Sequence, residues 1–518
     1  MNSSAFGNPG TNKNNDMPNS KIEHIFILML ENHSFDNIFG FSGIPGLRGL
    51  NGTESNSYGH TFRVQKGALD AMPADPGHEF ADTLEQLCGP NADFYPFGSY
   101  PAVNNSGFVS NFATSHSEDT GDAPHPNPGQ YEDVMRCFDT PNQLPVMYQL
   151  ATEFGVCDNW FSSLPGPTWP NRFFAYAASS ASLDDSPSAL EMAAWESLDG
   201  GIVFPNGSIF DLLRSRGYPF RLYQEHLSLT SFPIVLGLNG ISYKDDMHDL
   251  SEFEKDLKHG YPYPLTVIEP NYGDTLHGTF RGGSSQHPMD GMAAGENLIK
   301  NVYEAIRGVP EVWEKSLLII TYDEHGGFYD SVAPPAAPPP NDGSHPGGQY
   351  STNGFLFNQY GVRVPAVVVS PYIPKNTVCH TLFDHTSMLK TVEELLGLPS
   401  LTDRDNSANS LLPLLTEDHL RTDCPETLGA PAAMAATQVL AALPTRSEQP
   451  EMNDTPLPER GNIYGFLAIA GKVAHELSSG APEGFTSVVQ TLPSLLDIKT
   501  IGQAADYMNA VLQKARAV

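Results

Sequence analysis

Two pairs of polar side chains stand where largely apolar runs end, and their types suit the binding of a cation. Asp323 and Glu324 directly follow residues 316–322, and Glu31 and Asn32 follow a second run of the same kind. Short apolar runs are typical of buried strands, and open α/β sheets bind ligands where their strands end. Adjacent carboxylates repel each other unless a cation neutralises them, so the two pairs favour one metal site. The alternative is two solvated acidic loops.

A threonine hydroxyl on a proline-rich turn is a candidate nucleophile. Thr168 lies between Pro167 and Pro170, shortly before the apolar segment 173–177, which can begin a helix. Backbone N–H groups and the dipole of such a helix stabilise an anion, which suits attack on a phosphorus centre. The alternative role for this residue is an N-cap, and the local sequence taken alone favours the cap.

Alternating strand-like and helix-like segments must position these side chains. The alternation runs from residue 22 to about residue 398 and predicts an α/β fold with a largely parallel sheet between helices. The main expected strands are residues 22–30, 317–322 and 364–370. One expected helix follows His287-Pro288, and another begins near His385. Three apolar residues recur at four-residue spacing on one face of the first of these helices: Leu298, Val302 and Ile306.

The two ends of the chain differ in character from its middle. Residues 21–428 are predicted to form one catalytic domain, and residues 429–518 a small C-terminal helical appendage without visible chemistry. Its helix candidates are residues 432–443, 466–477 and 501–517. Residues 1–20 are rich in Asn and Ser and lack an apolar segment, so we expect a flexible lead-in rather than a signal peptide. The compartment stays open.

Composition excludes some partners. A net charge of −32 argues against nucleic acid, because phosphate contacts need clustered Lys and Arg. No run of about 18 apolar residues occurs, so no transmembrane helix is expected. The five cysteines are widely spaced and form no C-x-x-C pair, which indicates neither structural zinc nor a disulfide framework. Buried free thiols are the default expectation, with one or two bridges left open.

Four motifs occur in an order that resembles one enzyme family. They are Glu31-Asn32-His33-Ser34-Phe35-Asp36, Gly166-Pro167-Thr168-Trp169-Pro170-Asn171-Arg172, the His287-Pro288 helix start and Tyr322-Asp323-Glu324-His325-Gly326-Gly327-Phe328-Tyr329-Asp330. Together with Asp75-Pro76-Gly77-His78 they resemble the phosphoesterase family, which includes bacterial phosphatidylcholine-type phospholipases C, plant non-specific phospholipases C and a bacterial acid phosphatase. The resemblance covers roughly residues 22–430. It implies an alkaline-phosphatase-like fold, a three-layer α/β/α sandwich.

The resemblance also implies roles for single residues. One divalent cation would be ligated by Glu31, Asn32, Thr168, Asp323 and Glu324. Thr168 would be the nucleophile, and His287 and His325 would be catalytic. Substrate would be bound by His78, Asn171, Arg172 and His385. The implied ligands are all oxygen atoms, which favours Ca²⁺, Mg²⁺ or Mn²⁺ over zinc.

The expected function is metal-dependent hydrolysis of phospholipid phosphodiesters, of the phospholipase C type, through a phosphothreonine intermediate. One alternative is an acid phosphatase that acts on phosphomonoesters with the same site, and another is a non-catalytic, metal-bound lipid- or glycan-binding module. Peripheral contact with a membrane is expected to need an apolar rim near the site. The candidates for that rim are Trp169, Phe173, Phe328 and Tyr329, with packing in the core as the alternative for two of them.

Overall fold

The structure is a computed structural model that describes residues 21–115, 124–196, 200–225, 231–432, 454–478 and 494–515. The predicted lead-in, residues 1–20, lies outside the described residues, as does almost all of the predicted helix 432–443. The division of the chain into a catalytic domain and an appendage stays a prediction.

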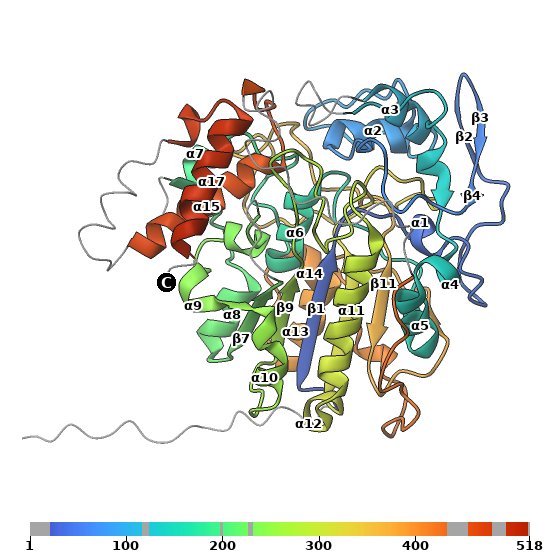
Figure 1. The fold of residues 1–518 in the computed structure, drawn as a ribbon, viewed down its shortest axis with the longest axis vertical. Helices are drawn as coiled ribbons and strands as arrows, with labels where there is room; N and C mark the ends of the chain where they lie inside the picture. The colour runs from blue at the N-terminus through green and yellow to red at the C-terminus, as the bar shows by residue number, and fades with distance from the viewer. Residues whose placement is uncertain are drawn as a thin grey trace, which may run out of the picture.

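An eight-stranded sheet forms the centre of the described chain (Figure 1), in the spatial order β12-β6-β11-β10-β1-β9-β7-β8. Its strands are β1 (His24–Leu30), β6 (Gly155–Cys157), β7 (Phe220–Gln224), β8 (Met247–Asp249), β9 (Leu265–Glu269), β10 (Ser316–Tyr322), β11 (Ala366–Val369) and β12 (Thr377–Cys379). Every neighbouring pair is parallel except those of β11, which runs antiparallel to β10 and β6. The largely parallel sheet is thus confirmed. β11 runs in the opposite direction because the segment that connects it to β10 begins and ends at the same edge of the sheet.

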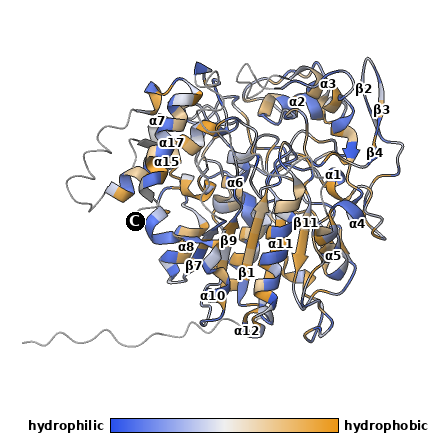
Figure 2. Ribbon diagram, viewed as in Figure 1, coloured by the Kyte–Doolittle hydropathy of each residue, from blue (hydrophilic) through white to orange (hydrophobic). Residues whose placement is uncertain are grey.

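The two central strands carry the two polar pairs. Every residue of β1 and β10 is buried, and Figure 2 shows β1 as an apolar element. The register pairs Leu30 with Tyr322, the last residue of each strand. Glu31 and Asp323 therefore leave the sheet side by side, as the sequence predicts.

Helices cover both faces of the sheet, which gives the predicted three layers (Figure 1). One face carries α5 (Pro145–Glu153), α10 (Phe253–Leu257), α11 (Met292–Arg307) and α12 (Pro310–Trp313), and the other carries α6 (Thr168–Ala177), α13 (Thr386–Leu396) and α14 (Asp403–Ser407). The predicted stripe on α11 is buried against the core: Leu298, Val302 and Ile306. Other helices between the strands are α8 (Ile209–Arg216) and α9 (Tyr243–Asp246).

Short elements cover the edge where β1 and β10 end, at the top of Figure 1. The helices there are α1 (Phe35–Phe39), α2 (Phe80–Cys88), α3 (Phe108–Thr114) and α4 (Thr140–Gln143). The strands there form two small sheets, β2 (Ser55–Tyr58) with β3 (His60–Arg63) and β4 (Gln65–Lys66) with β5 (Arg136–Cys137). A second hydrophobic cluster lies under these elements and includes Phe108, Met135 and Phe328.

The C-terminal helices pack onto the catalytic part. They are α15 (Asn462–Ser478) and α17 (Ile501–Ala515), which lie beside α7 (Ala189–Glu196) in Figure 1. A Cβ at Gly465 of α15 would lie 2.1 Å from the indole of Trp169, so only glycine permits this contact. Phe466 adds an edge contact to the same indole, with ring centroids 5.4 Å apart. None of the described helices combines the length and hydropathy needed to cross a bilayer.

Candidate active site

Four polar side chains meet where β1 and β10 end. Glu31, Asn32, Asp323 and Glu324 are each at most 1% exposed. The backbone N–H of Asn32 donates to Asp323 Oδ1 at 3.3 Å, which ties the two strand ends together. Asn32 has a φ of 65°, in the left-handed region that Asn tolerates better than most residues. The predicted convergence of the two pairs is therefore present in the structure.

Thr168 is the first residue of α6, and its hydroxyl does not cap that helix. Pro167 occupies the N-cap position, and Thr168 Oγ1 is buried and makes no hydrogen bond with the described residues. A buried hydroxyl without a partner is costly in a structural role. This contact pattern argues against the capping alternative.

Four of the predicted ligands offer oxygen atoms of the kind that a hard cation prefers. Four buried oxygens accept no hydrogen bond from the described residues: Glu31 Oε2, Asn32 Oδ1, Thr168 Oγ1 and Glu324 Oε1. Burial and then the charge of Asp323 raise the pKa of Glu31 well above its ordinary value, which shows how costly this concentration of negative charge is. A divalent cation would neutralise it, and an all-oxygen donor set is the kind that Ca²⁺, Mg²⁺ and Mn²⁺ prefer.

Asp323 differs from the other four predicted ligands, because both of its oxygens already accept hydrogen bonds. Arg172 Nε donates to Oδ2 at 2.8 Å, and the N–H groups of Asn32 and Glu324 donate to Oδ1. Burial raises the pKa of Asp323 to about 6 against the opposing charge of Arg172. Arg172 also donates to the carbonyl oxygen of Leu30 at 3.2 Å. The pair thus fixes the end of β1 as well as the carboxylate.

Two of the predicted site histidines have both ring nitrogens engaged within the protein. His325 Nε2 lies 2.7 Å from Gln86 Oε1, and its Nδ1 lies 3.2 Å from Glu324 Oε2. His385 Nε2 lies 2.6 Å from the carbonyl oxygen of Asp323, and Trp160 donates to its Nδ1 at 3.3 Å. These contacts orient the acidic pair.

The other two predicted site histidines form a separate group with Asp75. One ligand-type atom from each of Asp75, His78 and His287 lies within 4.8 Å of the other two. His287 is fully buried, and its two ring nitrogens make no hydrogen bond with the described residues. Its ring stacks on that of Phe280, with the ring centroids 3.6 Å apart. Burial lowers the pKa of His287 well below its ordinary value, so the free site holds it neutral.

Two glycines allow three segments to converge here. Gly326 and Gly327 have φ values of 62° and 72°. A Cβ at Gly326 would lie 2.1 Å from the carbonyl oxygen of Asn32, and one at Gly327 would lie 2.6 Å from Pro76. Glycine at these two positions therefore lets the turn after Asp323 contact the turn at Asn32 and the segment that leads to His78.

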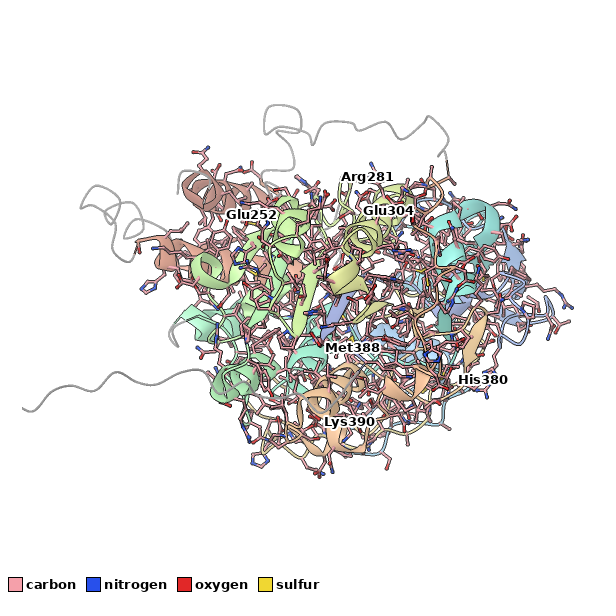
Figure 3. All side chains as sticks on the ribbon, turned by 90° about the horizontal axis from the view of Figure 1, so that it is seen from below. Glu252, Arg281, Glu304, His380, Met388 and Lys390 are labelled. Atoms are coloured by element: carbon pink, nitrogen blue, oxygen red, sulfur yellow. The ribbon has the colours of Figure 1, made fainter. Side chains whose placement is uncertain are left out.

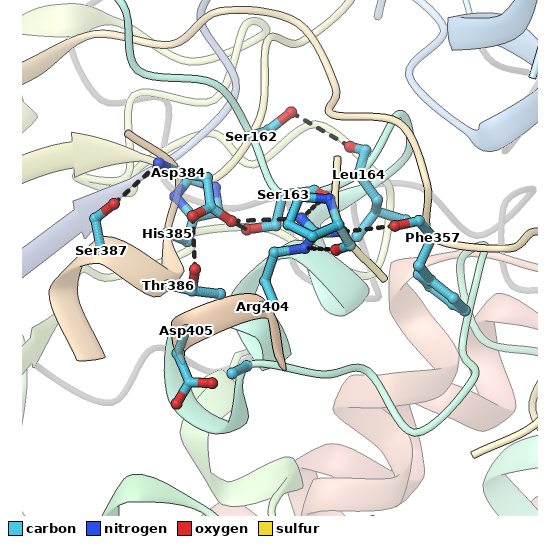
Figure 4. Close-up of polar contacts among 12 residues, drawn as sticks. Ser162, Ser163, Leu164, Phe357, Asp384, His385, Thr386, Ser387, Arg404 and Asp405 are labelled. Atoms are coloured by element: carbon cyan, nitrogen blue, oxygen red, sulfur yellow. Dashed lines mark hydrogen bonds and ion pairs between the residues drawn. The ribbon is translucent and has the colours of Figure 1, made fainter. Parts of the chain in front are cut away.

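The turn before Thr168 is held from both sides. Asn171 Oδ1 accepts the N–H of Leu164 at 3.1 Å, and its Nδ2 donates to the carbonyl oxygen of Gly166 at 2.9 Å. Figure 4 shows the other side, where Arg404 donates to the carbonyl oxygen of Ser163 at 2.8 Å. Asp384 accepts from the Ser163 hydroxyl at 2.9 Å and lies 3.5 Å from Arg404 Nη1.

Loss of the Arg404 side chain is expected to destabilise the protein strongly. Arg404→Met should lower the free energy of unfolding by about 3–5 kcal/mol, because it leaves the buried carboxylate of Asp384 without its cation. Denaturant unfolding measures this loss.

A double variant with Asp384→Asn supplies the control. Its loss should be clearly smaller than the sum of the two single losses, since the variant no longer buries an unpaired charge. Strictly additive losses would show that the two side chains act independently.

Two acidic motif residues serve the fold rather than the cation. Arg363 Nη2 donates to Asp36 Oδ1 at 2.8 Å, and its Nε donates to Asp330 Oδ1 at 3.0 Å. All three side chains are buried. The network joins the segment after β1, the segment after β10 and the segment before β11.

The sequence did not single out several residues that support the site. Asp384 and Arg404 act on the Ser163 turn, Gln86 acts on His325, and Phe280 stacks on His287. Their neighbours carry no distinctive spacing, so only the three-dimensional contacts reveal them. Asp75 is the exception, because it opens the Asp75-Pro76-Gly77-His78 motif.

Comparison with known proteins extends these observations. The sequence model of the phosphoesterase family matches residues 22–399. Non-specific phospholipase C6 of Arabidopsis thaliana is 36% identical over 439 residues, which cover 81% of this chain and 77% of the relative. Phospholipase C B of Mycobacterium tuberculosis is 30% identical over 423 residues, which cover 73% and 74%.

Solved structures match less of the chain. A protein of the alkaline phosphatase superfamily from Vibrio parahaemolyticus is 12% identical, with a TM-score of 0.31 over 52% of this chain and 64% of that one. The family match, by contrast, spans most of the sequence and contains every predicted ligand. The chain belongs to the phosphoesterase family.

Proposed function

We propose that this phosphoric ester hydrolase cleaves phospholipid phosphodiesters in the manner of a phospholipase C, with Thr168 as its nucleophile. The observation that carries the proposal is the buried, unbonded Thr168 hydroxyl at the N-terminus of α6, the helix whose Arg172 bonds to Asp323 and to the end of β1. The names of the relatives from Arabidopsis thaliana and Mycobacterium tuberculosis support the phospholipid substrate.

The residues that would hold a divalent cation are Glu31, Asn32, Thr168 and Glu324, with Asp323 as a fifth ligand already fixed by Arg172. When bound, the cation would lower the pKa of the threonine hydroxyl and offset the repulsion between nucleophile and phosphodiester. The backbone N–H groups at the start of α6 would stabilise the anionic phosphoryl oxygens.

The reaction would proceed in two displacements. Thr168 Oγ1 attacks phosphorus, the bond to the diacylglycerol oxygen breaks, and a phosphothreonine ester forms. Water then attacks the phosphothreonine and releases the head-group phosphate. Each displacement needs a proton donor for the departing oxygen or a proton acceptor for the attacking one.

His287 suits this proton transfer, with His78 beside it. His287 Nε2 lies 3.9 Å from the carboxylate of Asp75, which can stabilise the protonated ring. The negative charge of a bound phosphoryl group would also raise the pKa that burial depresses. We assign His325 to positioning Glu324, and His385 and Arg172 to positioning Asp323. Asn171 positions the turn before Thr168. These roles replace the catalytic role expected for His325 from the sequence and the substrate contacts expected for the other three residues.

The aromatic rim expected from the sequence is wrong. Trp169, Phe173, Phe328 and Tyr329 are buried, because they pack between α6, α15 and the loops over the edge. Two other aromatic residues are exposed on the segment between α2 and α3: Tyr95 at 74% and Phe97 at 60%. Phe94 next to them packs on Phe80, two residues past His78, with ring centroids 5.1 Å apart. We propose that Tyr95 and Phe97 form the rim that contacts a phospholipid surface.

A double variant, Tyr95→Ser with Phe97→Ser, should hydrolyse phosphatidylcholine vesicles about tenfold more slowly, a loss of ~1.4 kcal/mol in interfacial binding. Its rate on a soluble phosphocholine ester should stay within about twofold of wild type, because neither side chain reaches the buried oxygens. Leu420→Ser removes an exposed apolar residue elsewhere and serves as the matched control. Equal losses on both substrates would contradict the rim.

Product analysis tests the activity itself. Purified protein with added Ca²⁺, Mg²⁺ or Mn²⁺ should release phosphocholine and diacylglycerol from dispersed phosphatidylcholine. Release of phosphate from monoesters, with every diester left intact, would replace the proposal by the acid phosphatase alternative. Binding of lipid or glycan without turnover on any phosphoester would favour the non-catalytic module.

A further inference from the structure

Two cysteines face each other at the outer end of the central sheet. The parallel register of β6 and β12 places Cys157 directly opposite Cys379. Neighbouring strands lie about 4.8 Å apart, within the range of Cα separations that disulfides span. The two side chains are close enough for the acidity of each thiol to depend on the other. No other two cysteines of the described chain are paired by strand register.

The two thiols differ in accessibility. Cys157 is fully buried, whereas Cys379 is half-buried on β12, which is the edge strand. A cavity of about 460 Å³ opens beside Cys379 and is also lined by Thr381, Glu394 and Asn409. The next residue, His380, lies at the periphery of the molecule in Figure 3. A small reagent can therefore reach one sulfur atom of the pair.

The two thiols also differ in acidity, in the direction that this accessibility requires. Hydrogen bonding with Cys157, and then with Thr381, lowers the pKa of Cys379 to about 6 against the opposing effect of burial. The same hydrogen bond, and then burial, raise the pKa of Cys157. We therefore expect Cys379 to react first, as a thiolate, with a disulfide reagent. Cys157 would then react with the mixed disulfide that forms on Cys379.

We propose that Cys157 and Cys379 form a reversible dithiol–disulfide pair that small-molecule disulfides oxidise. The Cys379 thiolate attacks the disulfide RSSR, a Cys379–SR bond forms, and RS⁻ leaves. Cys157 loses its proton and attacks Cys379, which gives the Cys157–Cys379 bond and a second RS⁻. Both cysteines are oxidised, and RSSR is reduced to two RSH, which take up the protons.

The bond would join the bases of two segments that lead to the active site. β6 continues through Asp158 toward the Thr168 turn, and β12 continues through His380 toward Asp384. Asp158 and His380 already form an ion pair at 2.8 Å. The bond closes a long loop of the chain, so the oxidised form should melt at a temperature higher by ~5 °C.

The test is peptide mapping of the folded protein after exposure to glutathione disulfide at neutral pH. Wild type should lose two hydrogens and yield one cross-linked peptide pair that contains Cys157 and Cys379, and dithiothreitol should reverse both changes. Cys157→Ser should instead keep glutathione on Cys379, because the resolving thiol is absent. Cys379→Ser should not react, because Cys157 is buried.

Cys88→Ser is the matched control, since burial raises the pKa of Cys88 to about 11 and it faces no other cysteine by strand register. This variant should form the same cross-link as wild type. Free thiols at both positions after exposure would overturn the proposal. Stable glutathione on Cys379 of wild type would do so as well. These readouts do not depend on phosphoester turnover, so they remain valid whichever activity the enzyme has.

Discussion

Replacing Thr168 by alanine is expected to lower kcat on a phosphodiester at least ~10³-fold, because no other described hydroxyl at the start of α6 is both buried and unbonded. The folded protein should tolerate the change. Thr168 Oγ1 makes no hydrogen bond with the described residues, so its loss removes no contact from the fold. In the absence of the cation, thermal unfolding should therefore stay within about 2 °C of wild type.

Two further measurements identify the role of this hydroxyl. Thr168→Ser keeps a nucleophile and should retain far more activity than the alanine variant. Rapid acid quenching of wild type during turnover of phosphatidylcholine should trap phosphocholine on the peptide that contains Thr168, and the alanine variant should give none. An alanine variant within tenfold of wild-type activity would return Thr168 to the capping role.

Glu31→Gln is expected to weaken cation binding and activity together, each by at least ~10²-fold. The change keeps the shape of the side chain and removes the charge that shares a site with Asp323 and Glu324. A cation bound only to the native state stabilises it by RT ln(1 + [L]/Kd), so the variant should also melt at a lower temperature in the presence of metal.

Chelation separates this effect from ordinary destabilisation. Removal of the cation from wild type should lower its melting temperature, whereas the same treatment should change the Glu31→Gln variant little. Metal analysis of both proteins measures the stoichiometry directly. One cation per chain retained in a Glu31→Ala, Asp323→Asn double variant would refute a shared site.

The sequence was sufficient to predict the sheet edge and the identity of the polar side chains on it. Buried apolar runs have few alternatives to a central strand, and the residues that follow two adjacent parallel strands must emerge together. For this reason the sequence alone places Glu31 and Asp323 beside each other. The reversal of β11 has no such signature, because a buried strand reads the same in either direction.

Contacts inside the site could not be predicted to the same depth. The family resemblance implies that His385 and Asn171 belong near the chemistry, but not that their polar atoms already bond to Asp323, Trp160 and Leu164. The aromatic residues failed for a related reason. Proximity to Thr168 in sequence does not distinguish an indole that faces solvent from one that packs on Gly465, some three hundred residues later.

The antiparallel course of β11 has a consequence for how such an enzyme can diversify. Because β10 ends and β11 begins at the same edge of the sheet, both ends of the segment between them are fixed at the edge that carries the site. Its proline-rich part, residues 334–346, lies outside both strands, so a change in its length leaves their pairing unchanged. Protein engineers could therefore exchange this segment between homologues without altering the order of the strands, provided that its contacts with the rest of the fold are kept, such as the bond from Arg404 to the carbonyl oxygen of Pro338.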